Sequence, residues 1–337
     1  MSTTDAERVS EADLAAGRPA PLTRIFGWAN LTLMLAFILN SVLMFWFGWP
    51  GIGPLTSGAG GSTALAGMHV AIYAGALVLA IVLTLARDRS LRHEALIVSD
   101  ANAFFIRAAF WAVLFVGLAD TVISFVRVEG MLEGLVGPYL AVELGKSNFR
   151  GLWVHVPFAG LGVVFASFTR TLGFFWLALL VVAAELLIVF SRFIFSYEQA
   201  FMADLVRFWY AALFLFASAH TLLEDGHVRV DVIYAGFRRR ARGRVNALGS
   251  VLLGMTLCWC ILLLGMWTKS SIIVSPILVF ETTQTGFGMY VKYFMAGFLG
   301  VFGISMMLQF VSYMFESVAD WRDEPGGRPD HHSAHVG

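Results

Sequence analysis

Two adjoining stretches decide the fold: the apolar segment Phe208–Leu223 and the charged run Glu224–Arg244 that follows it. The run reads Glu-Asp-Gly-His-Val-Arg-Val-Asp-Val-Ile-Tyr-Ala-Gly-Phe-Arg-Arg-Arg-Ala-Arg-Gly-Arg. Apolar segments long enough to cross a bilayer lie on both sides of it. Because arginine clusters beside membrane helices stay on the cytoplasmic side, this run fixes the expected orientation of every other segment.

The composition indicates an integral membrane protein. Of the 337 residues, 58% are hydrophobic and only 14% are charged, whereas a soluble domain carries about a quarter charged residues. The net charge is zero and no basic face lies outside the membrane-flanking clusters, so we expect no nucleic-acid partner. Cys258 and Cys260 lie two apart in an apolar segment, where helical side chains point in different directions, so they are not expected to form a disulfide with each other.

Eight segments meet the requirement of about 20 apolar residues for a membrane span. The least regular is 151–168, which is short and contains His155 and Pro157; without it, the arginine-rich run would lie outside the cell. We therefore predict an all-α integral membrane protein with about eight transmembrane helices, a cytoplasmic interfacial arm and both termini in the cytoplasm. The expected helices lie near residues 25–48, 64–86, 104–126, 151–168, 172–195, 207–223, 245–268 and 289–315.

The regions outside the spans are polar. The first 21 residues and the tail 322–337 are expected to be disordered, the former in the cytoplasm. Residues 127–150 mix acidic and basic side chains with apolar ones, which predicts an amphipathic stretch on the outer surface.

The charged run itself is predicted to form an arm in the membrane interface. Its valines alternate with charged residues, which suits a short extended piece with one apolar face. Asp231 can then cap a helix on which Ile233, Tyr234 and Phe237 share a face. Such a helix lies in the interface, with long basic side chains reaching the headgroup phosphates. The expected membrane-anchoring residues are Arg238, Arg239, Arg240, Arg242 and Arg244.

Ionisable residues inside spans are costly and therefore informative. Asp120, Glu185 and Arg192 lie in predicted spans, and Asp204 can pair with Arg207 at the mouth of the sixth span. These groups could form an ion or proton path, or polar clamps between helices or subunits. No single helix carries acids at successive depths, which favours clamps.

Histidines raise a second possibility. His69 and His155 both fall near the outer ends of their spans, so a bis-histidine haem is geometrically conceivable. His220 has no partner at its own depth. The alternative is that these histidines are hydrogen-bonded packing residues, and an absorption spectrum would distinguish the two.

Four features of the last 150 or so residues follow one another in a characteristic order. They are Arg192-Phe193-Ile194-Phe195 closing a helix, Asp204 ahead of Arg207, the run Asp225–Asp231, and Glu281-Thr282-Thr283 followed by Gly286-Phe287-Gly288, Lys292 and Gln309. In this order they resemble the small membrane subunit, DctQ-like, of tripartite ATP-independent periplasmic (TRAP) transporters. The resemblance covers about residues 171–321 and leaves an additional N-terminal membrane region, 22–170, with about four helices.

The resemblance implies a scaffold subunit in the bacterial inner membrane rather than an enzyme, without cofactor or metal. It implies pairing with a large permease subunit, which imports an organic acid or related small solute captured by a periplasmic solute-binding protein. It also implies a set of subunit-interface or fold-defining residues. These are Arg192, Asp204, Arg207, His227, Arg229, Asp231, Glu281 and Lys292.

Two other functions stay open at this point. One is a membrane redox or haem-anchoring subunit. The other is an autonomous secondary carrier that uses Asp120, Glu185 and Arg192 along a path, which transport by the chain alone in liposomes would reveal. The additional N-terminal region could cover more of the large subunit, or could shape the face on which the binding protein docks through residues 127–150.

Overall fold

A computed structural model describes residues 17–58, 60–170, 174–197, 200–223, 234, 236–283 and 288–326. Eight helical stretches in these residues are long and apolar enough to span a membrane, which confirms the predicted all-α membrane fold. They are α2 (Pro21–Phe45), α4 (Thr63–Leu85), α5 (Leu91–Val128), residues 147–168, α10 (Phe174–Ile194), α11 (Ala200–Leu223), residues 239–266 and α16 (Lys292–Trp321).

Two of these stretches contain a π-helical segment. Residues 147–168 comprise α8 (Ser147–Arg150), η1 (Gly151–His155) and α9 (Val156–Phe168), and residues 239–266 comprise α13 (Arg239–Gly249), η2 (Ser250–Met255) and α14 (Thr256–Met266). The first π segment ends at His155, two residues before Pro157, which has no amide N–H to continue the regular helical ladder. This explains why the fourth span was the least regular in the sequence.

The chain forms two compact units that interleave along the sequence. Unit 1 comprises residues 1–100, 227–257 and 307–337, and unit 2 comprises residues 101–226 and 258–306. Each unit therefore combines parts of the additional N-terminal region with parts of the C-terminal region.

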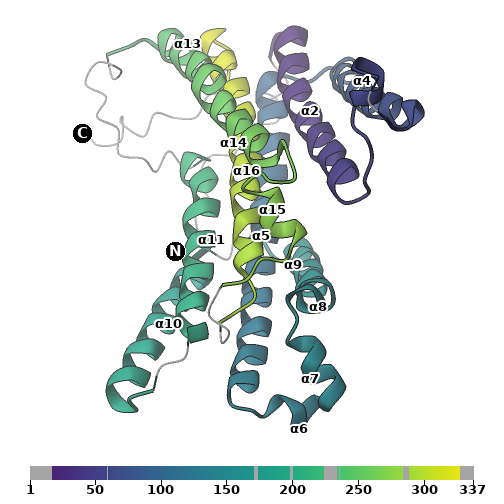
Figure 1. Cartoon of the computed structure of the whole chain (residues 1–337). Helices are drawn as coiled ribbons and strands as arrows, with labels where there is room; N and C mark the ends of the chain where they lie inside the picture. The colour runs from purple at the N-terminus through teal and green to yellow at the C-terminus, as the bar shows by residue number, and fades with distance from the viewer. Residues whose placement is uncertain are drawn as a thin grey trace, which may run out of the picture. The chain divides into compact units, whose positions relative to one another are not determined.

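In unit 1, α2 and α4 form a hairpin that a short helix, α3 (Gly53–Thr56), joins (Figure 1). Ser62 caps α4 by accepting a hydrogen bond from the Leu65 amide at 3.3 Å. The helix α13 approaches the end of α16 very closely: a Cβ added at Gly243 would lie 2.5 Å from the Trp321 backbone nitrogen. Small residues at such contacts let membrane helices pack backbone to backbone.

In unit 2, the helices α10 and α11 form a second hairpin (Figure 1). The core of unit 2 is aromatic. Phe110 of α5, Phe208 and Phe216 of α11, and Phe298 of α16 are buried together there. The helix α9 packs on α5 at Gly162, where an added Cβ would lie 2.4 Å from the Ala112 nitrogen. Three short helices complete the unit: α6 (Leu132–Val136), α7 (Pro138–Leu144) and α15 (Val274–Leu278).

Two predicted regions differ from expectation. The stretch 127–150 does contain short helices, but its last residue, Arg150, is fully buried rather than on the surface. Of the predicted arm, only Tyr234 and the residues from Gly236 onward are described. There Arg239, Arg240, Arg242 and Arg244 form the first turns of α13 at the start of the seventh span, not a separate interfacial helix.

The described residues at the two ends of the chain make contacts in unit 1. Residues 17–20 precede α2, and the Arg322 guanidinium donates a hydrogen bond to the Pro19 carbonyl at 3.1 Å. Glu324 is buried in unit 1. Predicted disorder in residues 1–16 and 327–337 concerns residues outside the described ones.

Candidate functional site

A fully buried ion pair lies in unit 2. The Arg150 Nη1 donates to the Asp120 Oδ1 at 2.8 Å and to the Ser124 hydroxyl at 3.0 Å. Its Nε donates to the Leu144 carbonyl at 2.6 Å, and its guanidinium lies 4.3 Å from the centre of the Tyr290 ring. Both charged side chains have no exposed surface. Because the two charges neutralise each other and the remaining polar contacts are internal, this pair can exist inside a membrane span.

His155 extends the ion pair toward α16. Its Nε2 lies 3.1 Å from the Asp120 Oδ1, and its Nδ1 lies 2.6 Å from the Tyr293 hydroxyl. An ionised carboxylate only accepts hydrogen bonds, so Nε2 is the donor to Asp120, and Nδ1 is the ring nitrogen that hydrogen-bonds with the Tyr293 hydroxyl. We call Asp120, Ser124, Arg150, His155, Tyr290 and Tyr293 the Asp120 cluster.

The cluster also holds the segment that leads into α16. The Tyr290 amide donates to the Asp120 Oδ2 at 2.8 Å, and the preceding Met289 amide donates to the Asp204 Oδ2 at 3.1 Å. The Thr283 hydroxyl donates to the same Asp204 oxygen at 3.3 Å. Two carboxylates from different helices, α5 and α11, thus bind consecutive backbone amides of one segment.

A third side chain binds the same segment. Arg127, at the end of α5, donates to the Gly288 carbonyl at 3.3 Å and to the Tyr290 hydroxyl, and its guanidinium lies 4.7 Å from the Tyr290 ring centre. The Tyr290 hydroxyl in turn donates to the Gly145 carbonyl at 3.0 Å. Residues 288–290 are therefore fixed to α5, to α11 and to the segment before α8. The polar side chains of Arg127, Asp120 and Asp204 are thus used to hold this backbone segment in place.

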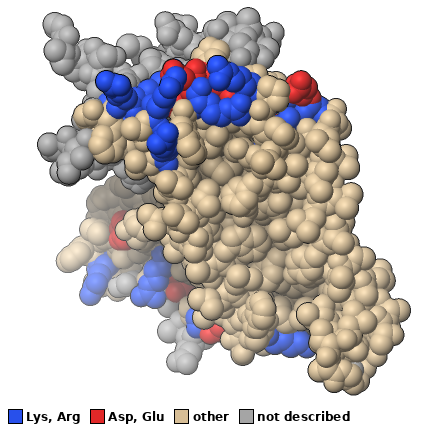
Figure 2. Space-filling view, turned by 90° about the horizontal axis from the view of Figure 1, so that it is seen from above, with Lys and Arg blue, Asp and Glu red and all other residues tan. Residues whose placement is uncertain are grey.

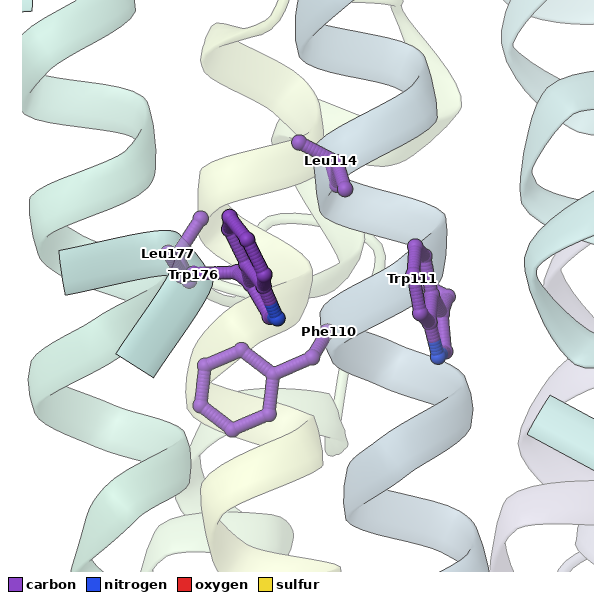
Figure 3. Close-up of a pocket in the computed structure, with 5 residues that line it drawn as sticks. All are labelled: Phe110, Trp111, Leu114, Trp176 and Leu177. Carbon is purple, nitrogen blue, oxygen red and sulfur yellow. The ribbon is translucent and has the colours of Figure 1, made fainter. Parts of the chain in front are cut away.

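A pocket in the same unit is too small for a transported solute. Phe110, Trp111 and Leu114 of α5 and Trp176 and Leu177 of α10 line it, as Figure 3 shows. Its volume is about 10 Å³, which is the space of roughly one water molecule. Three of the five side chains are purely hydrocarbon and the other two carry only an indole N–H, so the lining offers no charged group to an organic acid.

The C-terminal part of the chain matches a known protein family. Residues 177–320 match the model of the family described as "Tripartite ATP-independent periplasmic transporters, DctQ component". This part of the chain is therefore similar to the DctQ component. The family consists of transporter components, not enzymes, and it confirms the resemblance to a TRAP small permease subunit. No curated protein and no solved structure matches the chain.

The Asp120 cluster joins this DctQ region, residues 177–320, to the additional N-terminal region. Asp120, Ser124, Arg150 and His155 precede the DctQ region, whereas Tyr290 and Tyr293 belong to it. Asp204 and its partners Thr283 and Met289 lie within the DctQ region. The segment that contains Met289 and Tyr290 is thus bound both by a residue of the additional N-terminal region, Asp120, and by a residue of the DctQ region, Asp204.

The structure places four of the predicted site residues of unit 2 in two pairs, Asp204 with Arg207 and Glu281 with Lys292. Asp204 is buried and binds the segment ahead of α16, while Arg207 reaches it only at 4.0 Å with a side chain that is 72% exposed. Glu281 and Lys292 form an ion pair at 2.5 Å that was not foreseen as a pair. Arg192 lies exposed in the last turn of α10.

Three predicted site residues, His227, Arg229 and Asp231, lie outside the described residues. The arginines predicted to anchor the arm have protein contacts in unit 1. Arg239 donates to Asp320 at 2.9 Å, Arg240 pairs with Asp323 at 3.1 Å, and Arg244 lies over the Trp321 ring. Arg242 lies over the Tyr234 ring, and Arg238 precedes the first turn of α13.

A second polar cluster lies in unit 1. Arg92 of α5 donates to the Asp320 carboxylate at 2.7 Å and to the carbonyls of Glu324 and Pro325, and Asp320 also accepts from Arg239. We call Arg92, Arg239, Asp320 and Glu324 the Asp320 cluster. Elsewhere in this unit, Arg24 of α2 and Glu94 of α5 form a buried pair at 2.6 Å. Sequence reasoning did not find these pairs, because their members lie more than 60 residues apart.

The contacts of the histidines do not favour the haem interpretation. Both ring nitrogens of His155 bind protein groups, which leaves neither for an iron ion. The Nδ1 of His69 lies 2.6 Å from the Asn40 side-chain oxygen, and the ring packs edge-on against Trp49. His155 is therefore a hydrogen-bonded packing residue, and the proposed bis-histidine pair lacks one of its two ligands; the buried Nε2 of His69 has no hydrogen-bond partner among the described residues.

Proposed function

We propose that this chain is the small membrane subunit of a TRAP-type transporter in a bacterial inner membrane. In this proposal it pairs with a large permease subunit and works with a periplasmic solute-binding protein that captures an organic acid or related small solute. The single observation that carries the proposal is the DctQ match over residues 177–320, which includes α10, α11, α13, α14 and α16.

The internal use of polar groups supports a scaffold role. Asp120 and Asp204 bind backbone amides of the chain's own segment, and Arg150 is stacked and hydrogen-bonded inside the protein. Such groups stabilise a rigid frame rather than offer a path to a moving solute. Much of the surface is uncharged, as Figure 2 shows for one face, which suits a protein covered by lipid and by other membrane helices.

The candidate residues divide into two proposed roles. Asp204 is buried with partners within the chain and is proposed as fold-defining. Glu281 and Lys292 form an ion pair that is close to half exposed, and this pair is proposed to lie at the subunit interface. Arg192 and Arg207 are exposed and are proposed to contact the large subunit. His227, Arg229 and Asp231 are proposed as interface residues on the family resemblance alone.

We propose a topology with both termini in the cytoplasm. The arginines of residues 238–244 support it, because basic residues beside spans stay on the cytoplasmic side. The arginine side chains in this range that are partly exposed can also bind headgroup phosphates. In a variant in which Cys258 and Cys260 are replaced by alanine, a cysteine introduced by Gly236→Cys should react with an impermeant thiol reagent only after the membrane is opened. Labelling in intact cells would contradict this topology.

The additional region, residues 22–170, is proposed to extend the scaffold. Arg127, Arg150 and His155 support this because they help to fix the segment that leads into the last helix of the DctQ region. Residues 127–150 are then available to shape the face on which a binding protein docks.

Solute uptake tests the proposal. Cells should accumulate the solute only when this chain, the large permease and the binding protein encoded with it are all present. Deletion of this chain should abolish uptake while the large permease remains in the membrane. Uptake that continues undiminished without this chain would refute the scaffold role.

A further inference from the structure

A carboxylate lies exposed at mid-membrane depth on α10. Glu185 is near the middle of this helix, roughly 15 Å from each end at the rise of an α-helix. Its side chain is exposed, and no residue in the described part of the chain hydrogen-bonds or pairs with it. The other carboxylates discussed in this unit, Asp120, Asp204 and Glu281, all have partners.

Lipid is a poor environment for this group. Acidic side chains near the centre of a bilayer cost several kcal/mol unless a partner or water satisfies them, and they face the interior of an assembly almost always. No described residue of the chain satisfies Glu185, although it lies only about a quarter of a turn from the face of α10 that packs on α11 and the core. That face carries the buried Leu177, Ala184 and Ser191, with the partly buried Leu180, Val181 and Ile188 beside them.

The surface around Glu185 is apolar. Val182, Leu186 and Val189 lie within one turn of it and are each close to half exposed. An apolar helix face with one acidic group at its centre is complementary to a membrane helix that presents a basic side chain at the same depth. Pairing would neutralise both charges away from water.

Resting on the proposed function, we infer that this face of α10 docks on the large permease subunit, with Glu185 paired to a basic side chain of that subunit. The helix α10 belongs to the DctQ region, whose family works with a large permease. A second copy of this chain fits the face less well, because a symmetric contact through it would bring two Glu185 carboxylates together. Lipid alone leaves the charge unsatisfied.

Co-purification of the large permease with tagged variants of this chain tests the inference. Glu185→Leu removes the charge and suits lipid, and Glu185→Gln keeps a hydrogen-bonding group. The matched control is Glu133→Gln, which changes another exposed carboxylate that lies in α6, outside the spans. Removing one member of a buried charge pair should lower the recovered permease about tenfold or more for Glu185→Leu, and less for Glu185→Gln. Glu133→Gln should leave it unchanged.

A second measurement covers the possibility that a variant fails to fold. A photo-reactive amino acid placed at position 185 should cross-link the large permease in native membranes. Unchanged recovery of the permease with Glu185→Leu would overturn the inference, and so would a cross-link to a second copy of this chain or to lipid only. If the wild-type chain recovers no large permease at all, the proposed function itself fails, which is a different result from equal recovery by wild type and variants.

Discussion

The Asp120 cluster of unit 2 and the Asp320 cluster of unit 1 make similar contacts but differ in how far their charged side chains are exposed to solvent. Each uses an aspartate and an arginine to join the additional N-terminal region to the C-terminal part of the chain. In the first, both side chains have no exposed surface. In the second, the Asp320 side chain is 34% exposed and that of Arg239 is 45% exposed.

This difference predicts unequal contributions to stability. A fully buried pair leaves an uncompensated charge when one partner is removed, whereas water and salt take over at a partly exposed pair. Burial, rather than the number of ion pairs, should therefore rank the effect of each substitution.

Asp120→Ala should have the largest effect. It leaves Arg150 buried without its counter-charge and removes the acceptor of the Tyr290 amide, at a cost of about 3–5 kcal/mol. Thermal unfolding of the purified chain in detergent, followed by size-exclusion chromatography, measures the loss. The double variant Asp120→Leu with Arg150→Leu removes both charges and should recover part of the stability. If Asp120→Ala were as stable as the wild type, the claim that the fully buried pair contributes most to stability would be wrong.

Asp204→Ala should have an intermediate effect of about 1–3 kcal/mol, because the buried Met289 amide loses its acceptor. Hydrogen exchange should rise in residues 288–290 more than in the core of α11. Asp204→Asn keeps an acceptor oxygen and serves as the control. If both variants exchange alike and like wild type, Asp204 does not hold this segment.

Asp320→Ala should cost only about 1 kcal/mol, because Arg92 keeps the carbonyls of Glu324 and Pro325 and Arg239 can be solvated. The wild-type contribution should also weaken as salt is raised, unlike that of the Asp120 cluster. The difference in unfolding temperature between wild type and variant, measured at low and high salt, checks this. A loss as large as that of Asp120→Ala would contradict the ranking by burial.

Lys292→Ala should have the smallest effect, roughly 0.5 kcal/mol or less, because both members of the Glu281–Lys292 pair are close to half exposed. The same unfolding measurement applies, with Glu281→Gln as the reciprocal variant. A stability loss of several kcal/mol in either variant would show that solvent exposure does not determine how much an ion pair contributes to stability.

The sequence predicted the eight spans because a bilayer demands long apolar runs, and such runs are visible without knowledge of contacts. The bounds were less well predicted where spans contain charges. The third helix was expected at 104–126 but begins at Leu91, since Arg92 and Glu94 have partners that allow charged residues into a packed helix. The sixth and seventh begin earlier than expected for the same reason: Asp204 and Arg239 are paired.

The candidate site was only partly predictable. Asp120, Asp204 and His155 were singled out as polar residues in spans, which is a property of the local sequence. Their partners were not, because Arg150 stood in a segment that looked like a surface helix and Tyr290 carries no charge to draw attention. Pairing across 30 to 170 residues depends on the packing of helices, which local composition does not contain.

The central claim is that the chain works as one subunit of a larger transporter. Purification of the tagged chain from native membranes, with the associated proteins identified by mass spectrometry, tests it most directly. We expect a large permease subunit to be recovered with the chain in comparable amounts. A chain that is recovered alone, and that by itself moves a solute across liposome membranes, would contradict the account.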